Sequence, residues 1–253
     1  MKNESEIQKI ENEIYKRFDE LKDNKKIVSE NIDDSNFELK EILKFLGQAS
    51  DKKVLDVGCG KGKFCRKIKD IGFDIIGVDP SKELIKKAAE NNKDIKFIEA
   101  SATSLPFSDS EFDFIICIEV LEHIPDTEKA IKEMTRVLKP QGRFLIIDKN
   151  IFSLHHRYFV PTIFWKKYME ITNHWMYPRN FPFKEKYFSP RKIDKIIKKY
   201  CSKSKINFIY PTFEIKNYSF GKKIILKICG SVSFLQHKIL PFLDFFVAWV
   251  GEK

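Results

Sequence analysis

The sequence lacks paired cysteines, an apolar leader and an uncharged stretch long enough to cross a membrane. Its five cysteines are scattered, odd in number and form no C-x-x-C pair, which favours a reducing cytoplasm over an export route. Residues Met1–Leu21 are rich in Glu, Lys and Asn, so we expect no signal peptide. The apolar stretch 220–243 contains Lys238 and other lysines, so it falls short of the ~18 uncharged residues of a span.

Hydrophobic and aromatic residues are abundant but unevenly placed. At 253 residues the chain is long enough for one domain with appended pieces, and 23 Phe, 8 Tyr and 3 Trp are ample for a core. Residues 151–253 hold 23 of these 34 aromatics and carry 19 Lys and Arg against 6 Asp and Glu. A basic, aromatic C-terminal part indicates an anionic or amphiphilic partner.

A glycine-rich turn is the strongest local feature. Val54–Val57 is a short apolar run carrying one acid, and Gly58, Gly60 and Gly62 follow at alternate positions. Lys61–Ile71 then has the pattern of a helix, so the segment predicts a strand, a tight turn and a helix N-terminus. Glycine has no Cβ and can take positive φ, which lets bare backbone approach a ligand. The spacing matches neither the dinucleotide fingerprint G-x-G-x-x-G nor a P-loop.

Four further segments follow this turn. Phe73–Val78 predicts a second strand that ends in Asp79-Pro80. An acid at the carboxyl end of this strand is well placed to accept hydrogen bonds from both ribose hydroxyls of a nucleoside, a feature that dehydrogenases share. The other three segments are Ser101–Phe107, Phe112–Asp126 and Leu138–Ile147.

The pattern D-V-G-C-G-x-G at 56–62 resembles motif I of class I S-adenosylmethionine (SAM) methyltransferases. All five segments match that family in order over roughly residues 50–150, with similarity to type 11 and ubiquinone-pathway methyltransferases. The resemblance implies an enzyme with SAM as cofactor, and an acid near the cationic ammonium and sulfonium. Ser101 departs from the family, which usually has an Asp there to accept from the adenine amino group. The implied cofactor contacts are Asp56, Gly58, Cys59, Gly60, Gly62, Asp79, Pro80, Ser101, Ala102 and Ile118.

The alternation of strand and helix patterns predicts an α/β fold. We expect a Rossmann-like, seven-stranded, mostly parallel sheet with helices on both faces, an antiparallel C-terminal edge strand, N-terminal helices and a lid insertion. The predicted division is an N-terminal helical cap at 1–50, a SAM-binding core at 51–150, and a substrate lid that also completes the sheet at 151–253. Strands are predicted near 53–57, 74–78, 95–99, 112–118, 143–148, 206–215 and 245–250, and helices near 7–21, 35–46, 61–71, 81–91, 126–138 and 190–200, with Ser35 and Ser189 as caps.

Acids and histidines just past the fourth strand are the first candidates for catalysis, because strand ends of open α/β sheets face the ligand crevice. The run 117–126 resembles ubiquinone-pathway O-methyltransferases, in which acids and a histidine at the positions of Glu119, Glu122 and His123 are implicated in holding a divalent metal. The same residues can serve as a base, a helix start or a buried structural histidine, and we assign no metal. His155 and His156 in the lid are further candidates.

Three functions are compatible with the sequence. The first is methylation of an oxygen, nitrogen or carbon on a small or lipid-linked, amphiphilic acceptor. The second is RNA methylation, which is less favoured because residues 119–122 are not the N/D-P-P-Y/F tetrapeptide of base N-methyltransferases. The third is SAM binding without catalysis. Residues 220–243 suit either a peripheral membrane contact or a lid helix packed on the domain, so we expect a cytoplasmic protein that can associate with membranes.

Overall fold

The computed structural model describes most of the chain. His155, His156 and most of 220–243 lie outside the described residues, so the predictions that involve them are not addressed by the structure. The described residues are 3–24, 29, 32–48, 51–153, 161–172, 176–177, 180–209, 236–238 and 240–253.

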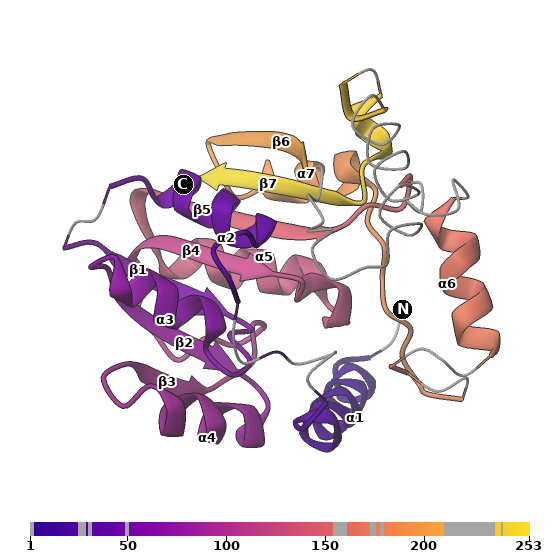
Figure 1. The fold of residues 1–253 in the computed structure, drawn as a ribbon, viewed down its shortest axis with the longest axis horizontal. Helices are drawn as coiled ribbons and strands as arrows, with labels where there is room; N and C mark the ends of the chain where they lie inside the picture. The colour runs from indigo at the N-terminus through magenta and orange to yellow at the C-terminus, as the bar shows by residue number, and fades with distance from the viewer. Residues whose placement is uncertain are drawn as a thin grey trace, which may run out of the picture.

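Seven strands form one sheet in the order β3-β2-β1-β4-β5-β7-β6 (Figure 1). β1 to β5 pair in parallel, and β7 runs antiparallel between β5 and the outer strand β6. This arrangement confirms the predicted fold class, including the antiparallel pair at the C-terminal side of the sheet. The bounds are β1 Lys53–Val57, β2 Asp74–Asp79, β3 Lys96–Glu99, β4 Phe112–Ile118, β5 Leu138–Lys149, β6 Lys203–Ile209 and β7 Phe246–Glu252.

Helices cover both faces of the sheet because its strands are apolar on both sides. On one face α2 and α3 bury Leu39, Ile42 and Ile68 against the strands. On the other face α5 and α7 bury Ile131 and Ile193 around Trp249, and these two layers enclose the main core. The bounds are α1 Glu4–Leu21, α2 Phe37–Leu46, α3 Lys63–Asp70, α4 Lys82–Asn91, α5 Thr127–Val137, α6 Thr162–Ile171 and α7 Pro190–Ile197.

Several boundaries differ from the prediction. β6 begins at Lys203 instead of residue 206, and Ser189 stands at the start of α7 without a side-chain capping hydrogen bond. The cap of α2 is Asn36, whose side chain accepts from the Leu39 N–H at 2.8 Å, whereas the Ser35 hydroxyl donates to Asp33. β5 begins five residues earlier than expected, because Lys139-Pro140-Gln141-Gly142 continues the strand instead of turning the chain. Gln141 takes a positive φ of 64° there. The backbone is therefore distorted at the position where proline and glycine predicted a turn, but the strand continues through it.

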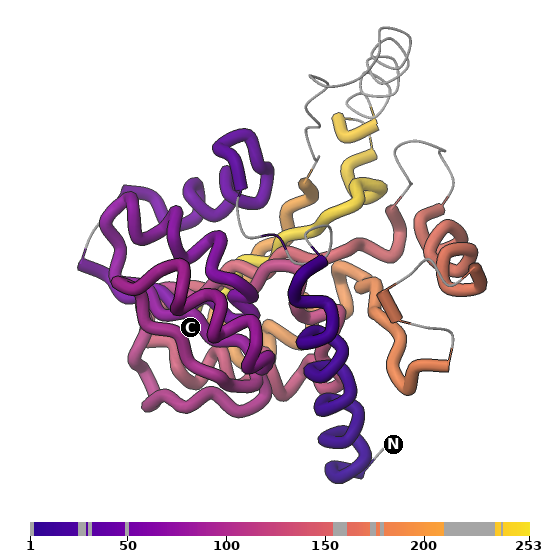
Figure 2. Tube along the Cα trace, turned by 60° about the horizontal axis from the view of Figure 1, so that its bottom comes forward, coloured from indigo at the N-terminus to yellow at the C-terminus, as the bar shows by residue number. Residues whose placement is uncertain are grey.

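The first helix, indigo in Figure 2, lies beside the glycine turn, because its Ile14, Tyr15 and Phe18 line the same cavity as Gly58 and Asp79. Asn3 caps α1 in a capping box with Glu6. Ile10 and Ile14 of α1 pack with Tyr177 and Phe183 in a small separate core. The predicted amphipathic helix is therefore present, and its apolar stripe connects the cofactor half of the chain to residues 176–183.

Candidate active site

The glycine turn bends sharply over the end of β2. The N–H groups of Gly58 and Cys59 both donate to the Val78 carbonyl, at 2.8 and 2.9 Å. Gly58, Gly60 and Gly62 have φ values of 78°, 54° and 80°, a region that residues with a Cβ enter at a cost. A Cβ built on Gly58 would also lie 2.2 Å from the Val120 side chain. The turn therefore needs glycine for both its conformation and its contacts.

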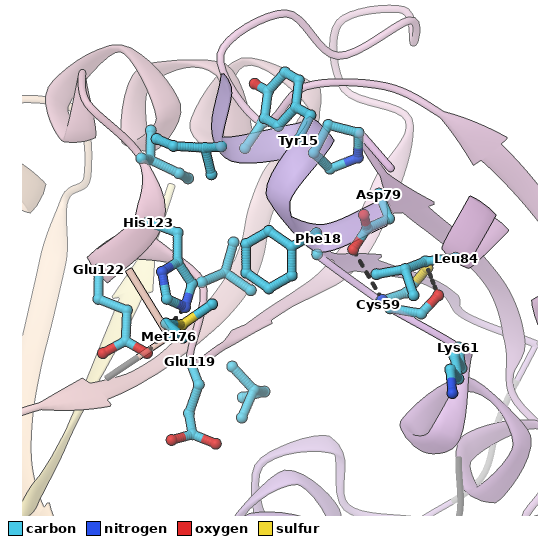
Figure 3. Close-up of a pocket in the computed structure, with 18 of the residues that line it drawn as sticks. Tyr15, Phe18, Cys59, Lys61, Asp79, Leu84, Glu119, Glu122, His123 and Met176 are labelled. Atoms are coloured by element: carbon cyan, nitrogen blue, oxygen red, sulfur yellow. Dashed lines mark hydrogen bonds and ion pairs between the residues drawn. The ribbon is translucent and has the colours of Figure 1, made fainter. Parts of the chain in front are cut away.

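Asp79 stands at the carboxyl end of β2 beside this turn (Figure 3). One carboxylate oxygen accepts from the Gly60 N–H at 3.0 Å and the other from the Ser81 N–H at 2.9 Å. Burial raises the pKa of Asp79 to about 6, against the opposing effect of these two hydrogen bonds. A carboxylate oxygen can accept more than one hydrogen bond, so both oxygens retain capacity for a ligand hydroxyl.

A cavity of about 480 Å³ opens between the glycine turn, α1 and the loop after β4. This volume is typical of small-molecule sites. Figure 3 shows Asp79 and Cys59 on one side, Glu122, His123 and Met176 on the other, and Phe18 between them. Most of the predicted site residues line the cavity: Gly58, Cys59, Gly60, Asp79, Pro80, Ser101, Ala102, Ile118, Glu119, Glu122 and His123.

Two predicted cofactor contacts do not line the cavity. Asp56 is buried beneath the turn, where it accepts from the Cys65 thiol at 3.2 Å, and burial raises its pKa to about 7. Asp56 was expected near a cationic sulfonium, but its side chain does not reach the cavity surface. The carboxylate instead pairs with Cys65 of α3 beneath the glycine turn. Gly62 caps α3, and a Cβ there would meet the Phe97 ring at 2.8 Å, so this glycine serves packing.

Ser101 connects the adenine side of the predicted site to α1. The Tyr15 hydroxyl donates to the Ser101 hydroxyl oxygen at 3.0 Å, and Thr103 lies 2.9 Å from the same oxygen. A serine in place of the family's aspartate thus gains a partner from the N-terminal helix. Because Tyr15 also lines the cavity, α1 forms a wall of the site.

Lys149 is the centre of a buried charge cluster at the other end of the cavity. Its ammonium donates to Glu122, lies 3.1 Å from Glu185 and 3.5 Å from Glu119. Burial lowers the pKa of Lys149, but the surrounding carboxylates outweigh burial and raise it well above its usual range. Burial together with the charge of Glu122 raises the pKa of Glu185 to about 7. One ammonium group therefore faces three carboxylates, two of which are buried.

His123 is held on both sides. Its Nε2 lies 3.2 Å from Glu122 Oε1, and its Nδ1 lies 3.0 Å from the Tyr177 hydroxyl. Burial lowers the pKa of His123 to about 4, so the ring is neutral at pH 7. The neutral ring pairs through Nδ1 with the Tyr177 hydroxyl, and its Nε2 lies close to Glu122. His123 then positions Glu122 in this arrangement rather than facing an acceptor.

Glu122 holds one buried atom without a hydrogen-bond donor. The side chain is buried, and its Oε1 is taken by Lys149 and His123. Among the residues that the structure describes, no hydrogen-bond donor reaches Oε2. A buried carboxylate oxygen without a partner is costly unless a ligand completes it. No group of three or more His, Cys, Asp or Glu in the described part of the chain has a metal-binding arrangement.

Several lining residues were not predicted. Lys149 is the last residue of β5, at the carboxyl end where ligand-facing residues gather in such sheets, so strand position alone could have identified it. Glu185 and Met176 come from the irregular segment after α6, where no periodicity marks the residues that turn inward. Phe18 belongs to the predicted stripe of α1, but that stripe gave no indication of which residues contact a ligand and which contact the core.

The pKa of Asp79 predicts how SAM binding depends on pH. A protonated Asp79 accepts hydrogen bonds poorly, so affinity should fall as pH drops through about 6. If binding requires the ionised form, one unit below that pKa weakens binding about tenfold. Equilibrium titrations at about pH 7 and pH 5 test this, with Asp79→Asn as the control. A wild-type affinity that stays constant across this range would contradict the assignment.

The comparisons with known proteins agree with this geometry. Residues 55–146 match the family model of the methyltransferase domain. The YcgJ protein of Bacillus subtilis, named an uncharacterized methyltransferase, is 36% identical over 104 residues, which span 39% of this chain and 41% of that protein. Its crystal structure superposes on 85% of this chain and 97% of its own, at 19% identity and a TM-score of 0.55.

Two more relatives extend the match. A demethylmenaquinone methyltransferase of Staphylococcus aureus is 27% identical over 202 residues, 72% of this chain and 81% of its own length. The phosphoethanolamine N-methyltransferase 2 of Haemonchus contortus, solved with SAM, matches 85% of this chain and 51% of its own at 18% identity and a TM-score of 0.58.

The methyltransferase-domain model matches residues 55–146, and the sheet has the fold of the solved methyltransferases on which it superposes. This match agrees with the family resemblance that the sequence shows over roughly residues 50–150. The matched segment covers less than half of the length of YcgJ.

Proposed function

We propose that the protein transfers a methyl group from SAM to a small or lipid-linked acceptor whose hydrogen-bond donor, a hydroxyl or an amine, faces Glu122. The observation that carries the proposal is Glu122 itself, a carboxylate that lines the cavity and whose buried Oε2 has no hydrogen-bond donor among the described residues. The relatives named demethylmenaquinone methyltransferases support a lipid-linked acceptor.

The residues around the glycine turn fit SAM. Bare backbone at Gly58 and Gly60 leaves room for the methionine part, and Asp79 offers carboxylate oxygens for the ribose. Ala102, Leu84 and other apolar side chains of the cavity suit the flat adenine. When bound, SAM supplies a methyl group on a positively charged sulfur that is already an activated leaving group.

The acceptor end of the cavity combines apolar and acidic side chains. Phe18, Met169 and Met176 provide an apolar wall, which suits a ring or a lipid chain. Glu119, Glu122 and Glu185 surround Lys149 opposite this wall. An amphiphilic molecule would therefore place its polar head at the acids and its tail along the wall.

The cluster can take a proton at one defined atom. Burial raises the pKa of Glu122 while Lys149 opposes that rise, which keeps its Oε2 a stronger proton acceptor than a surface carboxylate. An acceptor hydroxyl or amine would give its proton to Glu122 as its oxygen or nitrogen takes the methyl group, and the sulfur would keep the electron pair of the broken S–C bond, which leaves S-adenosylhomocysteine. Lys149 and His123 lie at Oε1, which fixes the orientation of the Glu122 carboxylate. Alignment of the acceptor atom with the methyl group and the sulfur accounts for most of the remaining rate enhancement.

Glu122→Gln tests this proposal. Glutamine keeps the shape but cannot take a proton, so we expect kcat to fall about 100-fold or more, within the range of general-base catalysis, with the affinity for SAM unchanged. The assay incubates methyl-labelled SAM with separate lipid, small-molecule and RNA extracts of the source cell. Glu128→Gln, an exposed acid on α5 paired with Lys199 at 2.8 Å, is the control. Label found only in RNA, or wild-type turnover in Glu122→Gln, would contradict the proposal.

A further inference from the structure

Exposed apolar side chains gather at one rim of the molecule. Of eight large hydrophobic residues exposed in the described part of the chain, only Ile71 lies elsewhere. The other seven define the apolar rim: Phe152, Ile163, Phe164, Tyr168, Ile171, Leu240 and Phe242. Single exposed apolar residues are ordinary, whereas a concentrated group marks an interaction surface.

Hydrogen bonds connect the three segments of the apolar rim. The Thr162 N–H donates to the Ser153 carbonyl at 2.9 Å, which joins the start of α6 to the chain beside Phe152. The Asn150 side chain donates to the Phe242 carbonyl at 2.8 Å. The segments therefore meet just beyond the carboxyl end of β5, and both views place α6 at the edge of the molecule (Figures 1 and 2).

The two sides of α6 face different surroundings. Phe164, Tyr168 and Ile171 recur at helical spacing on its outer side and are 66%, 56% and 57% exposed. On its inner side Met169 lines the cavity. Lys166 donates to the Glu185 carbonyl, which ties the helix to the acidic cluster. α6 thus separates the acceptor end of the site from the surroundings of the protein.

Charge around the apolar rim indicates the partner. Lys167 on α6, Lys184 and Lys238 are exposed, and residues 151–253 carry 13 more basic than acidic residues. Apolar side chains with lysines beside them match the acyl boundary and anionic headgroups of a bilayer. No helix in the described ranges is both long and apolar enough to span a membrane, so the contact would be peripheral.

We propose that the apolar rim docks on an anionic phospholipid surface, with α6 lying in the interface. The binding region predicted from sequence, 220–243, overlaps this surface only at Leu240 and Phe242 among the described residues. Docking depends on the outer face of α6 and not on the methyltransferase activity, although it would bring the acceptor end of the cavity to the membrane.

Vesicle sedimentation of the full chain tests the proposal. The probe is phosphatidylcholine vesicles with and without about 30% phosphatidylglycerol, a content that attracts basic surfaces. We expect retention on the anionic vesicles and a loss of at least about tenfold in partitioning for Phe164→Glu/Ile171→Glu. The matched control is Ile71→Glu, which removes a large exposed apolar side chain of the described part of the chain that lies outside the apolar rim, and which should sediment like wild type.

Three results with vesicles would overturn the proposal: no retention of the wild-type protein, equal retention of the double variant, or equal loss in Ile71→Glu. Sedimentation velocity without lipid tests for self-association. A wild-type protein that is a dimer, with a double variant that is a monomer, would show that the apolar rim binds a second copy of the chain and would overturn docking on a bilayer. SAM affinity and thermal unfolding of both variants are measured alongside. A double variant that still binds SAM but not vesicles would support docking whether or not an acceptor is found.

Discussion

Replacing Asp79 by alanine is expected to raise the Kd for SAM by at least about 100-fold, which corresponds to about 2.7 kcal/mol. A hydrogen bond to a charged group contributes about 1.5–3 kcal/mol, and the carboxylate offers one oxygen to each ribose hydroxyl. The change also leaves the Gly60 and Ser81 N–H groups without their acceptor, so the glycine turn loses a restraint. Isothermal titration of the purified chain with SAM measures the effect.

The matched control for this prediction lies on the same strand. Asp74 is exposed at the opposite end of β2, so Asp74→Ala should bind SAM like wild type. Asp79→Asn keeps one acceptor oxygen and should fall between the two. An Asp79→Ala protein that is folded and binds SAM with wild-type affinity would show that the nucleoside lies elsewhere.

Replacing Lys149 by methionine is expected to lower the free energy of unfolding by about 3–5 kcal/mol near pH 8, the usual cost of removing one partner from a buried ion pair. Glu122, Glu185 and Glu119 would then share a buried site without their cation. Chemical denaturation of the wild type and the variant measures the difference. The size of the effect follows from burial, because the same ammonium at the surface would contribute little.

The loss in Lys149→Met should depend on pH in a defined direction. Without the ammonium, the pKa of Glu122 and Glu185 in the folded chain rises further above the unfolded value, so the native state binds more protons than the unfolded state. Stability must then fall as pH rises, and part of the loss should be recovered near pH 5. Lys139→Met is the control, since Lys139 pairs with Asp113 at 2.8 Å near the surface and should cost about 1 kcal/mol or less. Equal losses in both variants would disprove the buried cluster.

The fold was predictable because its signals are local. Apolar runs that end at Gly58 or Asp79, with a helical pattern after each, specify the strand–turn–helix units one after another. The parallel order then follows from connection rules. The start of β5 was placed too late because Pro140 and Gly142 usually end structure, whereas here the strand accommodates them.

The candidate site was predictable only where it coincides with strand ends. Glu119, Glu122 and His123 follow β4 directly, and the cavity does bring them together. Glu185 and Tyr177 could not be found, because their positions depend on how an irregular segment packs against His123 and Lys149. The sequence placed Asp56 near the ligand because the motif includes it; burial shows that it supports the loop instead.

The central claim is that the glycine turn and Asp79 hold a sulfonium nucleoside and not a dinucleotide. Equilibrium titration of the full chain with SAM and, separately, with NAD tests this claim most directly. The structure predicts saturable binding of one SAM per chain and no measurable binding of NAD at the same concentrations. Saturable binding of NAD, or no binding of SAM by the folded protein, would contradict it.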